Sequence, residues 1–376
     1  MLNITQLKQK NSPGFLSNDE RIQFLCLGPE SYKDNIIHQK RVRNYVSSAH
    51  KKTYESKIAK RKNYRACQDL YLSNEKVGLL KVFGKSFQQL EKLHITCDYF
   101  TQKLSLRFPK LKTLSIYCAS QHDFPTKILK TILPSAPCLE FAKFKLFSYF
   151  SNMQKTIKCI MQYLSPHANL KEFSLIILSA SRNYTQANYF SFEILSNMML
   201  KLCRFQNLEK LKINCREPVL NSVQQELLGK LIVTNFRKLK DIDISLYLQD
   251  GPDSIEQLPY EESYAKFLDE IRNLPNLVSL TTTPLRKDIS DPSNNVIFDM
   301  IAQMKNLTHL KLQLSDSCEH TFADLSSFQS CLMKLPKLQA FCFDCTNCIL
   351  LINQYPYSTL TSSISQCKTL KHISIN

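Results

Sequence analysis

The feature that most constrains the fold is a short phrase, Leu-x-x-Leu-x-Leu or a close variant, that returns through most of the chain. It is clear at Leu90–Ile95 and again at Leu370–Ile375, and successive copies begin 21 to 38 residues apart. A recurrence of this kind predicts a repeat array, in which each unit buries its apolar face only by stacking on its neighbours. The copies begin at Leu90, Leu111, Leu139, Leu170, Leu208, Leu239, Leu277, Leu307, Leu338 and Leu370, with a looser copy at Cys67.

Each copy is expected to be a strand followed by a helix. Alternate residues of a strand point to opposite sides, so offsets three, five and seven from the first Leu should face the core and offsets two, four and six should face away from it. Amphipathic stretches with helical spacing, such as 192–202 and 296–301, lie between the copies. We therefore predict parallel strands in sequence order, starting near Leu93, Leu114, Leu211, Ile242, Leu310 and Phe341.

The recurring phrase and the helical stretch that follows it resemble the leucine-rich repeat family, and the resemblance covers residues 67–376. The units are long for that family, and their lengths are similar to those of ribonuclease-inhibitor-type or F-box-associated repeats. The resemblance implies an α/β solenoid of about ten to eleven repeats, with a parallel sheet on the concave face and helices on the convex face. It implies no particular function, because the family is defined by its scaffold.

Residues 1–66 precede the array and are expected to form a basic extension that is partly helical or disordered. The stretch 40–65 holds ten basic residues and a single acid, Glu55. It could be a nuclear import signal, a contact for nucleic acid or phosphate, a docking surface for an acidic protein, or a solvated basic helix. The candidate contacts for an acidic partner or nucleic acid are Lys40, Arg41, Arg43, Lys51, Lys52, Lys60, Arg61, Lys62 and Arg65.

Composition argues against several classes of protein. The chain has only 6 glycines, and neither of the common glycine-rich phosphate-binding motifs occurs. No apolar stretch reaches the roughly 18 residues of a membrane span, and the first 15 residues lack the apolar core of a signal peptide. We expect an intracellular protein, cytoplasmic in the first instance, with nucleus and mitochondrion as alternatives and no membrane partner.

The 14 cysteines are interpreted as free thiols in a reducing compartment. Cys97, Cys118 and Cys215 each fall seven residues after the first Leu of their repeat. That offset faces the core, where cysteine acts as a small hydrophobe. We predict that these three cysteines are buried, reduced and free of metal.

No catalytic or metal site is predicted. Cys342, Cys345 and Cys348 have a spacing found in zinc sites, but Cys342 and Cys345 should point to opposite sides of a strand and could not converge on one ion. No nucleophile-elbow or zinc-protease motif occurs. We expect a protein that is not an enzyme and has no cofactor.

The outward strand positions form the candidate binding surface, which should be basic through the middle and acidic at Asp241 and Asp243. Two long insertions, 179–184 and 249–262, should protrude from one rim of the solenoid. The candidate partner-binding residues are Lys92, His94, Tyr117, Phe141, Lys143, Lys145, Lys210, Lys212, Asp241, Asp243, His309 and Lys311.

These features are compatible with three alternative functions. The first is a non-catalytic scaffold that binds another protein, of unknown identity, through the concave face or the insertion rim. The second is a substrate-recruiting adaptor of a ubiquitin ligase, with residues 20–60 as a degenerate F-box. The third is a basic structural component of a ribonucleoprotein, binding nucleic acid through residues 40–65 together with Lys143, Lys145, Lys210 and Lys212.

The last repeat raises a separate expectation. Ile373 and Ile375 fall at core-facing offsets, yet no helix follows them in the sequence. An uncovered strand edge exposes apolar side chains and unpaired backbone groups. Either the 370–376 strand packs under the preceding helical stretch and keeps an exposed edge, or another molecule covers that edge, and we favour the second.

Overall fold

The structure is a computed structural model of residues 1–376, which form two compact units, 1–145 and 146–376. The residues that it describes are 43–44, 68–72, 88–97, 107–118, 126–147, 153–178, 191–215, 220–246, 260–282, 294–313, 326–344 and 364–375.

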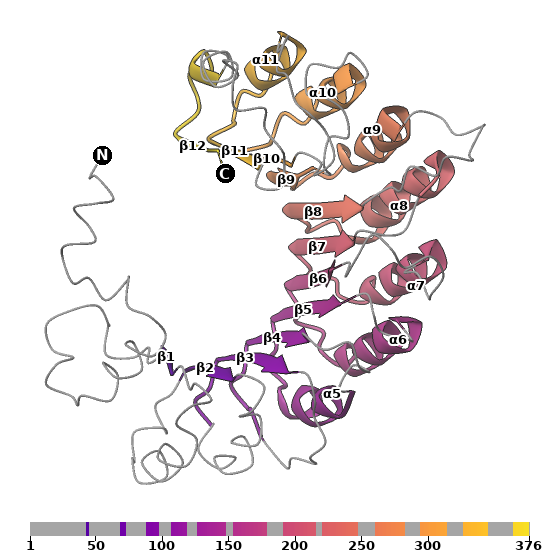
Figure 1. Ribbon diagram of the computed structural model, residues 1–376, viewed down its shortest axis with the longest axis vertical. Coiled ribbons are helices and arrows are strands. Elements are labelled where there is room, and N and C mark those ends of the chain that lie inside the picture. Colours follow the sequence, from indigo (N-terminus) through magenta and orange to yellow (C-terminus); the bar gives the residue numbers. More distant parts are fainter. Residues whose placement is uncertain are drawn as a thin grey trace, which may run out of the picture. The chain divides into compact units, whose positions relative to one another are not determined.

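The first unit is a parallel sheet with a short helical segment (Figure 1). Its strands are paired in sequence order, and equivalent positions of neighbouring repeats lie opposite one another, as Leu93 does with Leu114. The elements are β1 (Arg43–Asn44), β2 (Asp69–Leu72), β3 (Lys92–Cys97), β4 (Thr113–Cys118), α5 (Thr126–Ile132), η5 (Leu133–Ser135) and β5 (Phe141–Phe147), the last of which reaches the boundary between the units.

The second unit alternates strands and helices. The described pairings from β6 to β12 are parallel and follow sequence order, and helices α6 to α11 lie on one side of that sheet (Figure 1). The elements are α6 (Met153–Leu164), β6 (Glu172–Leu178), α7 (Phe192–Leu202), β7 (Lys210–Cys215), α8 (Ser222–Asn235), β8 (Asp241–Leu246), α9 (Tyr260–Ile271), β9 (Ser279–Thr281), α10 (Asn295–Ala302), β10 (His309–Gln313), α11 (Ser326–Met333), β11 (Ala340–Asp344) and β12 (His372–Ile375).

A shared backbone carbonyl sets the register of each repeat on the next. The carbonyl of Glu209, just before β7, accepts hydrogen bonds from the amides of Lys240 (2.8 Å) and Asp241 (3.1 Å) at the start of β8. The carbonyl of Lys240 in turn accepts from Val278 and Ser279 at 2.9 Å each. The same arrangement recurs at the carbonyls of Gln68, Glu91, Lys112, Lys171, Val278, Thr308 and Gln339.

Side chains reinforce this registration at the turn before each strand. The residue just before the first Leu bonds its counterpart one repeat away: Lys238 donates to Asn207 (2.7 Å), and Lys337 donates to Asn306 (2.8 Å). Within the same turn, the amide of Leu208 donates to the carbonyl of Phe205 at 3.0 Å. The turn therefore places the first Leu in the core and presents the next residues to the neighbouring strand.

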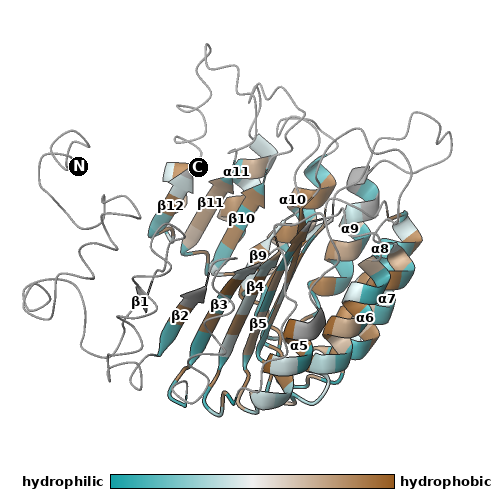
Figure 2. Ribbon diagram, turned by 60° about the horizontal axis from the view of Figure 1, so that its bottom comes forward, coloured by the Kyte–Doolittle hydropathy of each residue, from teal (hydrophilic) through white to brown (hydrophobic). Residues whose placement is uncertain are grey.

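The core is built from the inward offsets, as predicted. In β7, Leu211, Ile213 and Cys215 are fully buried, whereas the residues between them are partly exposed. Figure 2 shows the resulting alternation of hydrophilic and hydrophobic residues along the strands. Each helix contributes a buried stripe, for example Leu228 and Ile232 of α8.

The α/β repeat solenoid predicted from the sequence is confirmed, and the parallel strands near the six predicted positions appear in sequence order. Cys118 and Cys215 are buried free thiols, also as predicted. The burial of the Cys97 side chain is not described, and Cys345 and Cys348 lie outside the described residues. The boundary expected between residues 66 and 67 lies there too, and it stays a prediction.

The basic extension differs from expectation at one place. Arg43 and Asn44 form β1 and pair in parallel with Asp69 and Leu70 of β2. The sequence permits a helix over 40–65. The unpaired backbone groups at the edge of β2, however, offer hydrogen bonds to an extended segment, and Arg43 and Asn44 take up this pairing. The rest of that stretch lies outside the described residues.

The last strand has an exposed face. β12 pairs with β11, and Ile373 lies opposite the buried Phe341. No described residue covers the other side of Ile373, and its side chain is 53% exposed. The covering of this edge by another molecule stays a prediction.

Helices α8 and α9 pack unusually closely. A Cβ atom placed on Gly229 would lie 2.6 Å from Cβ of Glu270 and 3.2 Å from the carbonyl oxygen of Phe267. Neither of these atoms is the free end of a flexible side chain, so the contact depends on the missing Cβ.

Gly229→Ala is therefore expected to destabilise the chain, although alanine is the better helix former. Forced separation of packed helices should lower the free energy of unfolding by about 1–3 kcal/mol. The control Thr234→Ala, at an exposed position of the same helix, should leave the free energy of unfolding unchanged or raise it slightly. Chemical denaturation of the three proteins measures the effect, and equal stability of Gly229→Ala and wild type would show that the helices separate at no cost.

The buried thiols should be unreactive in the folded protein. Burial raises the pKa of the Cys331 thiol to about 12, and burial of Cys215 raises its pKa further, well above the usual range. Thiolate is the reactive form, so alkylation followed by mass spectrometry should modify the exposed Cys138 rapidly and these two only on unfolding. Rapid native modification of Cys215 would contradict the packing described for β7.

Candidate partner-binding face

The outward strand residues of each unit form a surface that the helices leave uncovered, here called its open face. In the first unit it consists of the outward residues of β3, β4 and β5, together with Asp69 of β2. In the second it consists of the outward residues of β6 to β12. Polar and charged side chains dominate both, and each is considered by itself.

The open face of the first unit carries an aromatic and basic cluster. Register places Tyr117 of β4 beside Lys145 of β5, and the Lys145 ammonium lies 4.9 Å from the centroid of the Tyr117 ring, a cation–π contact. Phe141 and Tyr117 are partly exposed, and Lys143 and Lys145 are exposed. Farther along, Lys92 lies 3.9 Å from the buried carboxylate of Asp69.

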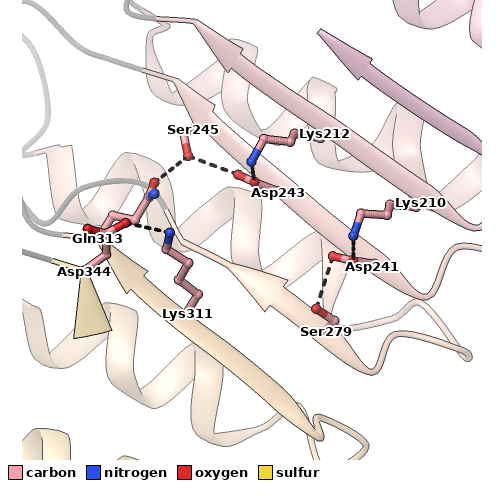
Figure 3. A network of polar contacts seen from close by, with 9 residues as sticks. All are labelled: Lys210, Lys212, Asp241, Asp243, Ser245, Ser279, Lys311, Gln313 and Asp344. Atoms are coloured by element: carbon pink, nitrogen blue, oxygen red, sulfur yellow. Dashed lines mark hydrogen bonds and ion pairs between the residues drawn. The ribbon is translucent and has the colours of Figure 1, made fainter. Parts of the chain in front are cut away.

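On the open face of the second unit, opposite charges stand side by side. Register places Lys210 opposite Asp241 and Lys212 opposite Asp243. The Lys210 ammonium lies 2.5 Å from Asp241, and Lys212 forms an ion pair with Asp243 (Figure 3). The basic and acidic residues predicted for this region thus lie on adjacent strands, where they form ion pairs.

The network extends beyond these two strands. The Ser245 hydroxyl lies 3.3 Å from a carboxylate oxygen of Asp243 and 3.1 Å from the side-chain oxygen of Gln313, so its single hydrogen is within reach of either acceptor and the network extends from β8 to β10 (Figure 3). Asp243 and Ser245 are consequently buried, although they occupy outward positions.

The pairing also shifts the titration of Lys210. Partial burial opposes its charged form, but the hydrogen bond to Asp241 and the charges of Asp241, Glu172 and Asp243 outweigh that cost and raise the Lys210 pKa. The lysine therefore stays protonated, and Asp241 is further fixed by a 3.1 Å hydrogen bond from Ser279. A fixed pattern of paired charges favours recognition of a complementary surface over general attraction of polyanions.

A shallow depression lies on the same face over β9 to β12, with a volume of about 270 Å³. It forms because Ser279, Ala340 and Ser374 are small, whereas His309 and His372 flank Ala340 in register. The small outward residues of β9 and β11 are visible in the sequence and could have indicated this hollow. Lys311, on its border, pairs with Asp344 at 2.6 Å.

The sequence-predicted contacts thus fall into four groups. Tyr117, Phe141, Lys143 and Lys145 lie together on β4 and β5, and Lys210, Lys212, Asp241 and Asp243 form the paired network. Lys92 and His94 lie on β3, and His309 and Lys311 lie on β10. Among the basic residues at 40–65, only Arg43 falls within the described backbone, and both rim insertions lie mainly outside it.

Two further features bear on the chemistry of the surface. Over the parts of the chain that the structure describes, no three histidine, cysteine, aspartate or glutamate side chains are grouped as a metal site would require. Within those same parts, none of the helices combines the length and apolar character needed to cross a membrane.

Comparison with known proteins adds little to this geometry. No protein-family profile matches the chain, and no curated protein is similar to it. Among solved structures, a Bacteroides fragilis protein from the Northeast Structural Genomics Consortium is similar at 12% identity and a TM-score of 0.39, over 92% of this chain and 76% of that one. A similarity of this size transfers no function.

The Lys212–Asp243 pair should contribute measurably to stability because Asp243 is buried. In a double-mutant cycle with Lys212→Ala and Asp243→Ala, the coupling should be about 1–2 kcal/mol in the free energy of unfolding. The matched control is Lys240 with Glu209, a 2.9 Å pair between the same two repeats whose side chains are 53% and 41% exposed. Its coupling should not exceed about 0.5 kcal/mol, and equal couplings for the two pairs would refute the role given to burial.

Proposed function

We propose that this chain is a non-catalytic scaffold of the leucine-rich repeat type that binds another protein through its open faces. The observation that carries the proposal is the fixed polar surface of the second unit, where strands in register hold Lys210, Lys212 and their aspartates in one arrangement. A preorganised surface loses less conformational entropy on binding than one whose side chains must be ordered.

The size of the surface is compatible with this function. Seven strands at about 4.8 Å spacing span roughly 30 Å across the second unit. With the length of its strands, the area is comparable with the smaller class of specific protein interfaces. The depression over Ala340 and its flanking histidines would give this surface a recess for a protruding side chain.

The alternatives fare differently against the same residues. A ribonucleoprotein role rested partly on Lys210 and Lys212, and these lysines are neutralised by aspartates. The F-box proposal rests on residues 20–60, of which only Arg43 and Asn44 are described, and these form a strand. A ubiquitin-ligase adaptor and a nucleic-acid component are therefore retained only as second choices.

Site-specific photo-crosslinking tests the proposal. A photoreactive amino acid is placed at Thr281 or Ser115 on the open faces, or at Gln154 or Lys158 on the exposed side of α6. Irradiation in a lysate of the source cells should give discrete protein adducts from the first pair of positions and none from the second. Adducts from the helix positions alone, or from none of the four, would contradict binding through the open faces.

A further inference from the structure

The depression over β9 to β12 is formed by small and large side chains that alternate across the strands. Register places His309 of β10 opposite Ser279 on one side and opposite Ala340 on the other, and it places Ala340 opposite His372 of β12. Ala340 therefore forms the floor of a slot between two exposed imidazole side chains. The strands that carry these residues lie side by side within the second unit (Figure 2).

The spacing of the strands sets the width of this slot. β10 and β12 lie on either side of β11, so at about 4.8 Å between neighbouring strands the two histidines are about 9.6 Å apart across the sheet. A ring that stands over Ala340 then has its centre about 4.8 Å from each histidine. Aromatic pairs prefer centroid separations of about 4.5–7 Å, in stacked and in edge-to-face arrangements. The slot therefore has the width to take one aromatic ring between the two imidazoles.

One wall of the slot is held in place by the neighbouring repeat. The Thr308 hydroxyl donates to the backbone carbonyl of Val278 at 3.0 Å, and the same oxygen lies 2.8 Å from Nδ1 of His309. Since that hydroxyl has a single hydrogen, both bonds form together when Nδ1 of His309 donates to the Thr308 oxygen. The imidazole is thus restrained before a ligand arrives, and it loses less conformational freedom on binding.

The charges around the slot favour a neutral guest. Lys311 is the only charged side chain among the described residues that line the depression, and it pairs with Asp344 at 2.6 Å. A guanidinium or ammonium group would enter beside Lys311 with no carboxylate in the described lining to offset its charge. A carboxylate would have to compete with Asp344 for the lysine. An uncharged aromatic ring meets neither obstacle.

The size of the depression favours a side chain of another protein over a free small molecule. Its volume of about 270 Å³ is below the roughly 300–1,000 Å³ of typical small-molecule pockets. It also lies on the open face for which protein binding is proposed. Aromatic residues that fill such recesses supply a large share of the binding energy at protein interfaces.

We propose that the slot between His309 and His372 binds an aromatic side chain of a partner protein. The ring stands over Ala340, packs on its methyl group and contacts an imidazole on each side. This inference rests on the proposed scaffold function and specifies the class of residue by which the partner is held.

The test uses capped amino acids as probes of the full chain. The chain has 8 histidines, so labelling histidine with carbon-13 gives few imidazole signals, and those of His309 and His372 are identified by their loss in His309→Ala and His372→Ala. Titration with N-acetyl-tyrosinamide should shift these two signals through the ring current of the phenol. N-acetyl-leucinamide and N-acetyl-argininamide should bind at least about threefold more weakly, because they lack the aromatic contacts.

Substitutions test whether the slot itself is the site. Ala340→Leu fills the floor and should weaken binding of N-acetyl-tyrosinamide by about tenfold or more. His309→Ala and His372→Ala should each weaken it by about two- to tenfold, since each removes one aromatic contact. The matched controls Ser115→Leu and His94→Ala, at partly exposed positions of the first unit, should change affinity less than about twofold. Thermal melting shows whether each variant is folded.

Two kinds of result would overturn the inference. Tighter binding of the leucine or arginine probe than of N-acetyl-tyrosinamide would exclude an aromatic guest. Unchanged affinity in folded Ala340→Leu, or the absence of a shift at both His309 and His372, would exclude the slot as the site.

Failure of this inference is distinguishable from failure of the scaffold function. Ala340→Leu should reduce the crosslinks formed from Thr281, because the partner can no longer insert its ring. Crosslinks that keep their full yield in Ala340→Leu would show that the chain binds a protein without the slot, which contradicts this inference alone. Absence of crosslinks from the wild-type sequence background would contradict the scaffold function, whatever N-acetyl-tyrosinamide does.

Discussion

The shared carbonyl at the start of each strand is the interaction on which the rest of the structure depends. One oxygen accepts two amides from the next repeat, as Glu209 does from Lys240 and Asp241, and this leaves no freedom for a strand to slip by one residue. A slip of that size would turn every core leucine outward. The repeat-to-repeat lysine bonds, such as Lys238 to Asn207, strengthen the same constraint at the turn.

The surface chemistry follows from that register. Lys210 and Lys212 meet Asp241 and Asp243 because equivalent positions of neighbouring repeats lie opposite one another. A buried carboxylate such as Asp243 is tolerated only with its partners in place, so the network resists rearrangement. On β4 and β5 the same register brings Tyr117 beside Lys145, whose ammonium lies over the tyrosine ring.

Much of the fold could be predicted because its signal is repeated. The spacing of leucines determines which residues face the core, and Leu211 and Ile213 are buried where the offsets place them. Pairing across strands is harder to predict, because Lys212 is 31 residues from Asp243 in the sequence and only the register of the two strands brings them together. The contact between Ser245 and Gln313 was not predictable from offsets, since it joins residues that are 68 positions apart in the sequence and lie on strands that are not adjacent. The pairing of Arg43 with Asp69 was not predictable from the leucine spacing, because β1 has no copy of the leucine phrase and pairs with the available edge of β2.

The ion pairs between adjacent repeats also mean that the repeats of this array are not interchangeable. Solenoids commonly gain and lose repeats by duplication and deletion, since each unit touches only its neighbours. Removal of the single repeat that contains β8 would bring Lys210 and Lys212 beside Ser279 and Thr281, two side chains that carry no charge. The backbone ladder could close over such a deletion, but the two lysines would lose their carboxylates. The order of these particular repeats is thus fixed by charge as well as by shape. This region should therefore tolerate the duplication or deletion of a repeat less readily than an array of identical repeats would.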